Sequence, residues 1–192
     1  MAGSTLIFLT RELLITPEKA WETIVSENRS SASVRNGFLL PFLAVMSLSA
    51  LAGSLIFTTT RLSPFYSVLD GIRCFVVFLI TVYASAYTLT LVTKNLNMGN
   101  SFPVCFKLIV YSLAPLFLCQ ILSRFFESLQ FVNILAIFGL NIFWTGAEKV
   151  LPSSTKKSIL LAAAAVIFIL FIAVTDYTIA KIFDRVYYAF HY

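Results

Sequence analysis

The chain has 192 residues, of which 59% are hydrophobic and only 12% are charged, and its formal net charge is +5. So little charge cannot cover the surface of a water-soluble domain of this length, and much of the apolar surface must therefore face lipid. The basic residues are scattered between apolar runs and are not gathered with aromatic residues on one face, which excludes an ordinary nucleic-acid-binding protein.

The N-terminal region, residues 1–35, carries helical patterns that are too polar to cross a bilayer. It lacks both an early basic residue and a long apolar run, so we expect that it is not a cleaved signal peptide. From Pro17 to about Arg29 the apolar residues, Trp21 among them, fall on one side of a helix, and charged residues such as Glu22 fall elsewhere. This pattern predicts an amphipathic helix at the membrane interface, with its apolar face among the headgroups. Two interpretations remain open: the helix only anchors and covers the bundle, or Trp21 and Glu22 form a docking surface for a cytosolic partner.

Five long runs with few charges follow, and each can cross a bilayer core of about 30 Å as a helix. We therefore predict an all-α polytopic membrane protein, with five transmembrane helices after the amphipathic interfacial helix. The membrane domain is predicted at 36–182, with approximate spans at 36–60, 66–93, 104–123, 128–147 and 158–180, and a short tail at 183–192.

Two opposite charges lie near the start of the second predicted span. Asp70 and Arg73 are three residues apart, which places them on the same face of a helix. An ionisable group inside a membrane often marks a functional site. A local salt bridge near the interface explains the same pair, and both interpretations remain open.

The third predicted span is the most irregular, because a proline lies near its middle. It reads KLIVYSLAPLFLCQILSRFF from Lys107 to Phe126, with Tyr111, Ser112 and Pro115 at its centre. Proline cannot donate a hydrogen bond to the carbonyl of Tyr111, and its ring presses on that turn, so we expect a kink. In lipid the freed carbonyl needs another partner, such as Ser112, a neighbouring helix or a water molecule.

Small and polar residues characterise the fourth predicted span. Gly139 and Gly146 fall near one helix face and allow a neighbouring helix to approach closely. Asn133 and Asn141 place polar groups inside the span. They either hydrogen-bond to other helices or line a polar pathway together with Tyr111 and the break in the third span.

The sequence contains no pattern typical of an active site or a metal centre. Cys74, Cys105 and Cys119 lie in or beside apolar runs without a CxxC or Cys/His spacing, and the single histidine is His191. The HExxH, GxSxG and glycine-rich phosphate-loop motifs are absent. We therefore expect no catalysis, no cofactor and no metal ion.

The distribution of basic residues indicates an orientation in the membrane. With five spans the two termini lie on opposite sides, and nine of the fourteen Lys and Arg residues fall on the side of the N-terminus. Because basic residues are enriched in cytoplasmic loops, we expect a cytosolic N-terminus and a C-terminus on the outside.

Three stretches of the chain carry a resemblance to a known family. The lead-in TPEKAWETIVSEN, Thr16 to Asn28, precedes a span that opens with FLLP. KLIVYSLAP, Lys107 to Pro115, places a tyrosine before a proline, and IFGLNIFWTG, Ile137 to Gly146, carries the glycines of the fourth span. In order and spacing these stretches resemble the Yip family, the Ypt/Rab-interacting multispanning membrane proteins, and in particular its bacterial members.

The resemblance has one notable departure. Eukaryotic members of the family carry an Asp-Leu-Tyr-Gly-Pro motif in a longer polar N-terminal region, and this chain lacks that string. Binding of a Rab-type GTPase is therefore not implied. What the resemblance implies is a small helical protein with partners in or on the membrane, located in a bacterial cytoplasmic (inner) membrane.

Two functions remain open at this point. The first is a non-catalytic membrane scaffold or adaptor, in membrane organisation or a trafficking-like process. Its partners are the lipid bilayer and either a membrane or cytosolic protein or a second copy of the chain. The second is a small transporter, channel or lipid-moving protein, in which the polar residues of the third and fourth spans border a cavity.

Overall fold

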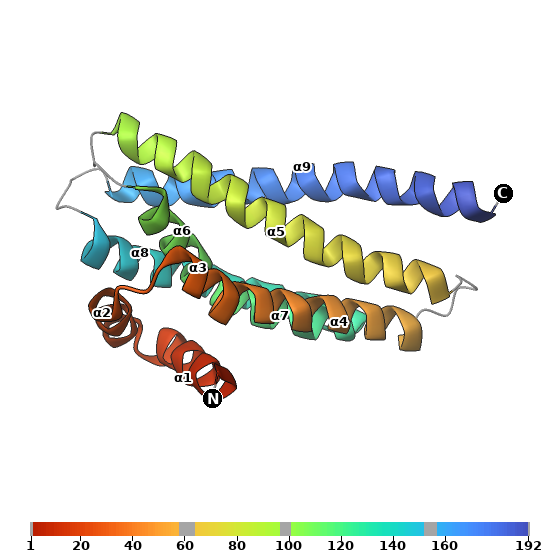
Figure 1. The fold of residues 1–192 in the computed structure, drawn as a ribbon, viewed down its shortest axis with the longest axis horizontal. Coiled ribbons are helices and arrows are strands. Elements are labelled where there is room, and N and C mark those ends of the chain that lie inside the picture. Colours follow the sequence, from red (N-terminus) through yellow and green to blue (C-terminus); the bar gives the residue numbers. More distant parts are fainter. Residues whose placement is uncertain (1, 58–63, 97–100, 152–156, 192) are drawn as a thin grey trace.

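The structure, a computed structural model, describes residues 2–57, 64–96, 101–151 and 157–191, and all regular elements within these ranges are helical (Figure 1). Arg61 and Lys156, two of the basic loop residues, lie outside them. In chain order the elements are α1 (Ala2–Ile15), α2 (Pro17–Glu27), α3 (Ser31–Val34), the π-helical η1 (Arg35–Leu39), α4 (Leu40–Phe57), α5 (Pro64–Asn95), α6 (Phe102–Ser112), α7 (Ala114–Phe125), the 3-10 helix η2 (Glu127–Ile137), α8 (Phe138–Val150) and α9 (Lys157–His191).

Within the described residues, four continuous helical stretches are long and apolar enough to cross a membrane. They are Ser31–Phe57, Phe65–Asn95, Ser128–Val150 and Ser158–Phe183. The pair α6 and α7 passes the same test together but is bent by 45° at a short break. The predicted all-α polytopic membrane fold is thus confirmed, and its five spans are obtained when α6 and α7 count as one broken span.

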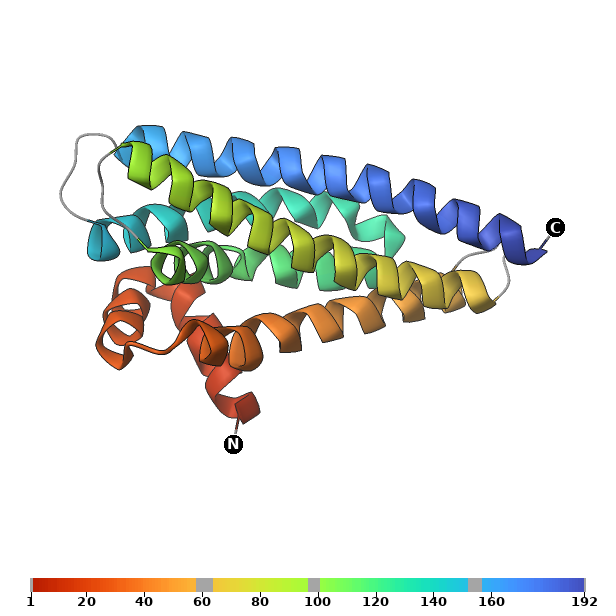
Figure 2. The ribbon, with the colours of Figure 1, turned by 45° about the horizontal axis from the view of Figure 1, so that its top comes forward.

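The N-terminal helices meet one end of the bundle. Pro17 occupies the first turn of α2, where its missing N–H costs nothing, and α2 ends at Asn28, whose backbone is left-handed with φ 39°. Figure 1 shows α1 and α2 beside that end, while the C-terminus lies at the opposite end. Figure 2 shows α1 pointing away from the long helices.

The long helices pack in two linked groups. α5 lies along both α4 and α9, and α7 packs against α4 and η2 (Figures 1 and 2). Gly53 of α4 makes the contact with α7 possible, because a Cβ at this position would collide with the main-chain carbonyl of Arg124. Two serine contacts add polar links between α4 and α5: Ser47 Oγ donates to the carbonyl of Gly71 at 2.7 Å, and Ser54 and Ser67 share a hydrogen bond of 2.9 Å.

Ion pairs lie at both ends of the apolar region. Glu22 contacts Lys149 at the end of the bundle where α2 lies, and Arg73 contacts Asp176 toward the other end.

Between these two ion pairs α9 is uncharged over 158–175, which corresponds to about 27 Å of helix and so to one bilayer core. Large apolar side chains are exposed along α9 and η2, for example Val166, Ile169 and Ile134. These exposed residues are the lipid-facing surface that the composition requires.

The break between α6 and α7 lies inside the Tyr111–Pro115 motif. Leu113 separates the two helices with φ −83° and ψ 0°, and Pro115 occupies the first turn of α7. The N–H of Leu113 still donates to the carbonyl of Ile109 at 3.1 Å. The chain therefore changes direction within one turn without losing all of its backbone hydrogen bonds.

Replacing Pro115 with alanine restores an N–H that can donate to the carbonyl of Tyr111, so we expect the 45° bend to decrease. Spin labels on Val104→Cys in α6 and Leu122→Cys in α7 report the change as a longer distance between the two labels. Pro41→Ala, in the first turn of α4, is the matched control and leaves this distance unchanged. A distance that is also unchanged in Pro115→Ala would show that packing, and not the proline ring, maintains the bend.

Candidate functional site

The indole of Trp21 is inserted into the bundle. Only 1% of this residue is exposed, and its Nε1–H donates to the carbonyl of Ile142 in α8 at 2.9 Å. Its ring meets the ring of Tyr111 edge-on at 5.8 Å, and it fills the space that Gly146 leaves open, because a Cβ there would overlap the indole. The indole of Trp21 therefore packs against α8 and not among headgroups, where the amphipathic pattern placed it, because this position satisfies both its apolar ring and its polar N–H.

Glu22 lies on the solvent side of the same helix. Lys149 Nζ donates to Glu22 Oε1 at 2.8 Å, which links α2 to the last turn of α8. This hydrogen bond and the charge of Lys149 hold the pKa of the Glu22 carboxyl below its usual value. The pair is therefore formed at neutral pH and is lost as the pH falls through that lowered pKa.

The break in the third span is covered by Gly139 of α8. A Cβ added to Gly139 would lie 2.5 Å from the carbonyl oxygen of Ser112 and 4.0 Å from Cδ of Pro115. The hydroxyl of Ser112 donates to the carbonyl of Leu108 at 2.6 Å, within its own helix. Main chain outside a regular helix is tolerated in a membrane only where protein covers it. Glycine at 139 provides that cover by allowing α8 to touch the break directly.

Asn133 lies in a hydrogen-bonded network between α7 and η2. Its Oδ1 accepts from Gln120 Nε2 at 3.1 Å and from Ser123 Oγ at 3.4 Å, and its Nδ2 donates to Gln130 at 3.4 Å. Gln120 also accepts a hydrogen bond of 3.3 Å from Nε of Arg124. The network connects a charged group near the end of α7 with the interior of the bundle.

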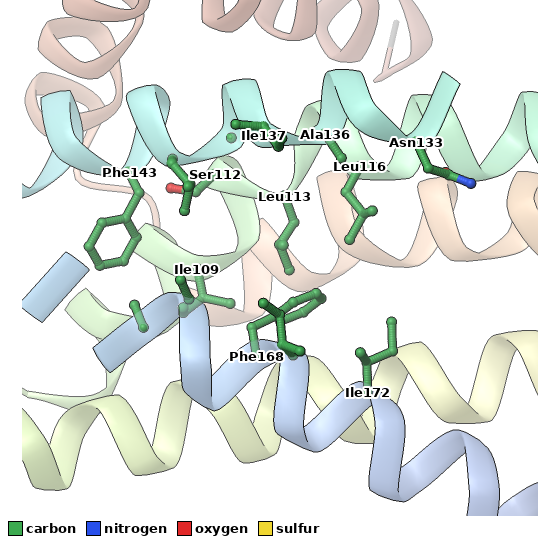
Figure 3. A pocket seen from close by; sticks show the side chains of 15 residues that line it. Ile109, Ser112, Leu113, Leu116, Asn133, Ala136, Ile137, Phe143, Phe168 and Ile172 are labelled. Atoms are coloured by element: carbon green, nitrogen blue, oxygen red, sulfur yellow. The ribbon is translucent and has the colours of Figure 1, made fainter. Parts of the chain in front are cut away.

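A groove of about 330 Å³ runs between the α6–α7 break, η2–α8 and α9. Its walls are apolar, and Ser112 and Asn133 are among the few polar residues that line it. Figure 3 shows Asn133 at one end of the groove and Phe143 at the other, with Phe168 of α9 on the facing wall. We refer to this space as the central groove.

The structure joins Arg73 to a residue far away in the sequence. Its Nη2 lies 2.8 Å and its Nε 3.2 Å from Oδ1 of Asp176, so α5 and α9 are linked by a charge-assisted contact. Asp70 lines the same small cavity as Arg73, together with Phe183. The sequence gives no local signal for this ion pair, because Arg73 and Asp176 lie 103 residues apart.

Asn141 is exposed on the outside of α8, and within the described part of the chain its side chain makes no hydrogen bond. It does not line the central groove, and neither do Tyr111 and Pro115. The polar residues proposed to border a pathway are therefore not brought together: Tyr111 is buried against Trp21, and Asn133 is the one that reaches the groove.

Among the described residues, no group of three or more His, Cys, Asp and Glu side chains is placed to hold a metal ion. Cys74, Cys105 and Cys119 are each buried as free thiols and lie on different helices of the bundle. The side chain of His191 lies outside the described part.

Comparison with known proteins identifies the family. The family model described as the Yip1 domain matches residues 11–175, which is most of the chain. The chain belongs to the Yip1 domain family. The resemblance carried by the Tyr111–Pro115 stretch and the glycines of α8 is thereby confirmed. Neither the curated proteins nor the solved structures contain a significant match.

Several contacts of the Yip1 domain had no signal in the sequence. Phe42 of α4 stacks on Phe117 of α7 at 5.6 Å, and Phe38 packs on Tyr111 at 4.9 Å. Gln120 completes the network of Asn133. A chain with 19 phenylalanines offers too many equivalent aromatic pairs for spacing to select these.

Gly139→Ala is expected to lower the free energy of unfolding by about 1–3 kcal/mol, because the new methyl group forces α8 away from the carbonyl of Ser112. Gly37→Ala is the matched control: a Cβ at this position would have no heavy atom within 4 Å, and alanine favours a helix by up to about 1 kcal/mol. Unfolding of both variants in mixed micelles gives the comparison. Equal stabilities would mean that the close approach at Gly139 is not important.

Trp21→Phe removes the donor to Ile142 and part of the buried ring, and we expect a loss of about 1–3 kcal/mol in the free energy of unfolding. Trp144→Phe makes the same chemical change at a half-buried position of α8 and should cost clearly less. The same micelle titration measures both. If the two variants are equally stable, Trp21 does not anchor α2 to the bundle.

Proposed function

We propose that this Yip1 domain protein is a non-catalytic scaffold or adaptor of a bacterial cytoplasmic membrane, with its N-terminus in the cytosol and its C-terminus outside. Its interaction surface is the outward face of η2 and α8. This face, which we call the outer stripe, consists of Phe131, Ile134, Leu135, Phe138 and Asn141. The excess of basic residues on the N-terminal side supports this orientation.

The single observation that carries the proposal is the position of Asn141. It lies eight residues before Lys149, or about 12 Å along the helix axis, and so close to the middle of a bilayer core of about 30 Å. An amide that finds no hydrogen-bond partner in hydrocarbon costs several kcal/mol. A polar group on an otherwise apolar outer face is therefore expected to meet a polar group of another helix.

A second copy of the chain is the partner that this face fits best. The Asn141 side chain carries both a donor and an acceptor. In a two-fold dimer each residue near the axis faces itself, so two Asn141 amides can satisfy each other. The four apolar residues of the outer stripe then pack against their equivalents, and the dimer presents both cytosolic ends side by side to further partners.

Asn141→Leu is expected to weaken self-association by about 3- to 30-fold, which corresponds to the loss of one hydrogen bond between helices in a membrane. Energy transfer between donor- and acceptor-labelled copies in lipid vesicles, measured at several protein-to-lipid ratios, gives the association constant. Asn95→Leu removes the same amide from an exposed position at the end of α5 and should leave the constant unchanged.

Three results would contradict the proposed dimer. One is a wild-type chain that stays monomeric at every protein-to-lipid ratio. Another is an Asn141→Leu variant that associates as strongly as the wild type. Cross-linking from the outer stripe in native membranes to a different membrane protein, without chain-to-chain cross-links, would likewise replace the dimer by a complex with that protein.

A further inference from the structure

The central groove lies on a lipid-facing side of the bundle. Ile137 of η2 and Ile169 of α9 both line it, and each is 65% exposed, so the groove opens toward the bilayer between these two helices. Its inner wall is formed by the α6–α7 break, where Leu113 and Leu116 point toward α9 (Figure 3). A molecule that occupies the central groove therefore enters it from the membrane.

Water is a poor occupant of this groove. A water molecule needs two or more polar partners, and cavities with apolar walls stay dry. The hydroxyl of Ser112 already donates to its own helix, at Leu108. The apolar walls and a volume of about 330 Å³, at the lower end of the usual range for ligand sites, suit a flexible hydrocarbon chain.

The length and position of the groove correspond to one leaflet. Along α9 its lining extends from Ala164 to Ile172, which is about 12 Å of helix. Asp176, which marks the end of the uncharged part of α9, follows about 6 Å further on. The groove thus runs from the middle of the membrane toward the end of the bundle where Arg73 and Asp176 pair.

The open end of the groove toward that interface is polar and leads to a cation. Asn133 lines the groove, Gln120 donates to Asn133, and Nε of Arg124 donates to Gln120. This contact uses one of the five N–H groups of the guanidinium, and its two terminal nitrogens carry the other donors in a geometry that matches phosphate oxygens. The apolar central groove therefore matches the hydrocarbon chain of a lipid, and the basic group beyond its polar end matches an anionic headgroup.

We propose that the central groove is a binding site for one acyl chain of an anionic phospholipid, from the leaflet nearer the C-terminus, with the lipid phosphate at Arg124. The acyl chain lies along Leu116 and Phe168 and ends near the break at Ser112. Asn133 and Gln120 meet the ester region between chain and headgroup. The site lies on a different side of η2–α8 from the outer stripe and does not depend on the dimer.

The test uses the full-length protein in phosphatidylcholine vesicles that contain a minor fraction of phosphatidylglycerol with a photoactivatable diazirine in one acyl chain. After illumination, labelled residues are located by mass spectrometry. We expect labelling concentrated on the groove residues, with Leu116 and Phe168 as the main positions. Labelling spread evenly over all lipid-facing helices would mean that lipid only surrounds the protein, and would overturn the proposal.

Variants that fill the groove distinguish labelling by a bound acyl chain from labelling by the surrounding lipid. Ala165→Phe places a ring in the groove and should abolish most of the labelling of Phe168, whereas Ala162→Phe, on the exposed side of the same helix, should leave it unchanged. Ile169→Trp and Val166→Trp form a second pair at exposed positions, where folding is less sensitive to size. Equal labelling within both pairs would overturn the proposal.

The headgroup part of the proposal is tested by exchanging the labelled lipid. Wild-type protein should favour labelled phosphatidylglycerol over labelled phosphatidylcholine, and Arg124→Gln should reduce this preference about tenfold, the usual effect of losing one charge-assisted contact. Arg185→Gln removes the same charge from an exposed position of α9 that does not line the groove, and should preserve the preference. Equal labelling by the two lipids in the wild type would overturn the assignment of Arg124.

Discussion

The contact between the carbonyl of Ser112 and Gly139 is the constraint on which the bundle depends. A span that breaks in mid-membrane exposes polar main chain, and such a break is stable only where protein covers it. Glycine at 139 lets the backbone of α8 cover the break directly, because a Cβ there would lie 2.5 Å from that carbonyl. This close approach of α8 to the carbonyl of Ser112 determines the position of η2–α8 relative to α6–α7. Because α6–α7 bends by 45° while α9 continues past it, the two separate on the other side, and the central groove is the space that remains.

α8 connects the three regions of the molecule that we consider functional. At its C-terminal end it receives the indole of Trp21 over Gly146, so the amphipathic helix α2 packs as part of the bundle. Its middle covers the break through Gly139, and its outward face carries Asn141. A change at Gly139 or Gly146 therefore acts on the placement of α8, and through it on the direction that the outward face with Asn141 takes.

Periodicity and composition were sufficient to predict the architecture, because a long apolar run in a bilayer has few alternatives to a helix. The positions of Gly139 and Gly146 on one face were likewise readable from their spacing, as was the break before Pro115. The residues that contact one another across the bundle could not be predicted from the sequence. Trp21 was predicted at the interface because an amphipathic pattern shows which face is apolar but not what covers it, and here α8 covers it in place of lipid. Arg73 pairs with Asp176, 103 residues away, which no local spacing indicates.

Asn133 and Asn141 show how one residue type in one span can have two roles. Both lie on η2–α8, but Asn133 turns toward α7, where Gln120 and Ser123 satisfy its amide, whereas Asn141 turns outward. Successive residues of an α-helix differ by about 100° in direction, so Leu140, which lines the central groove, and Asn141 face different surroundings. A second copy bound at the outer stripe therefore leaves the groove open to lipid. In the arrangement that we propose, η2–α8 holds a second copy of the chain on one side and a lipid chain on the other, and both partners lie in the same membrane as the protein.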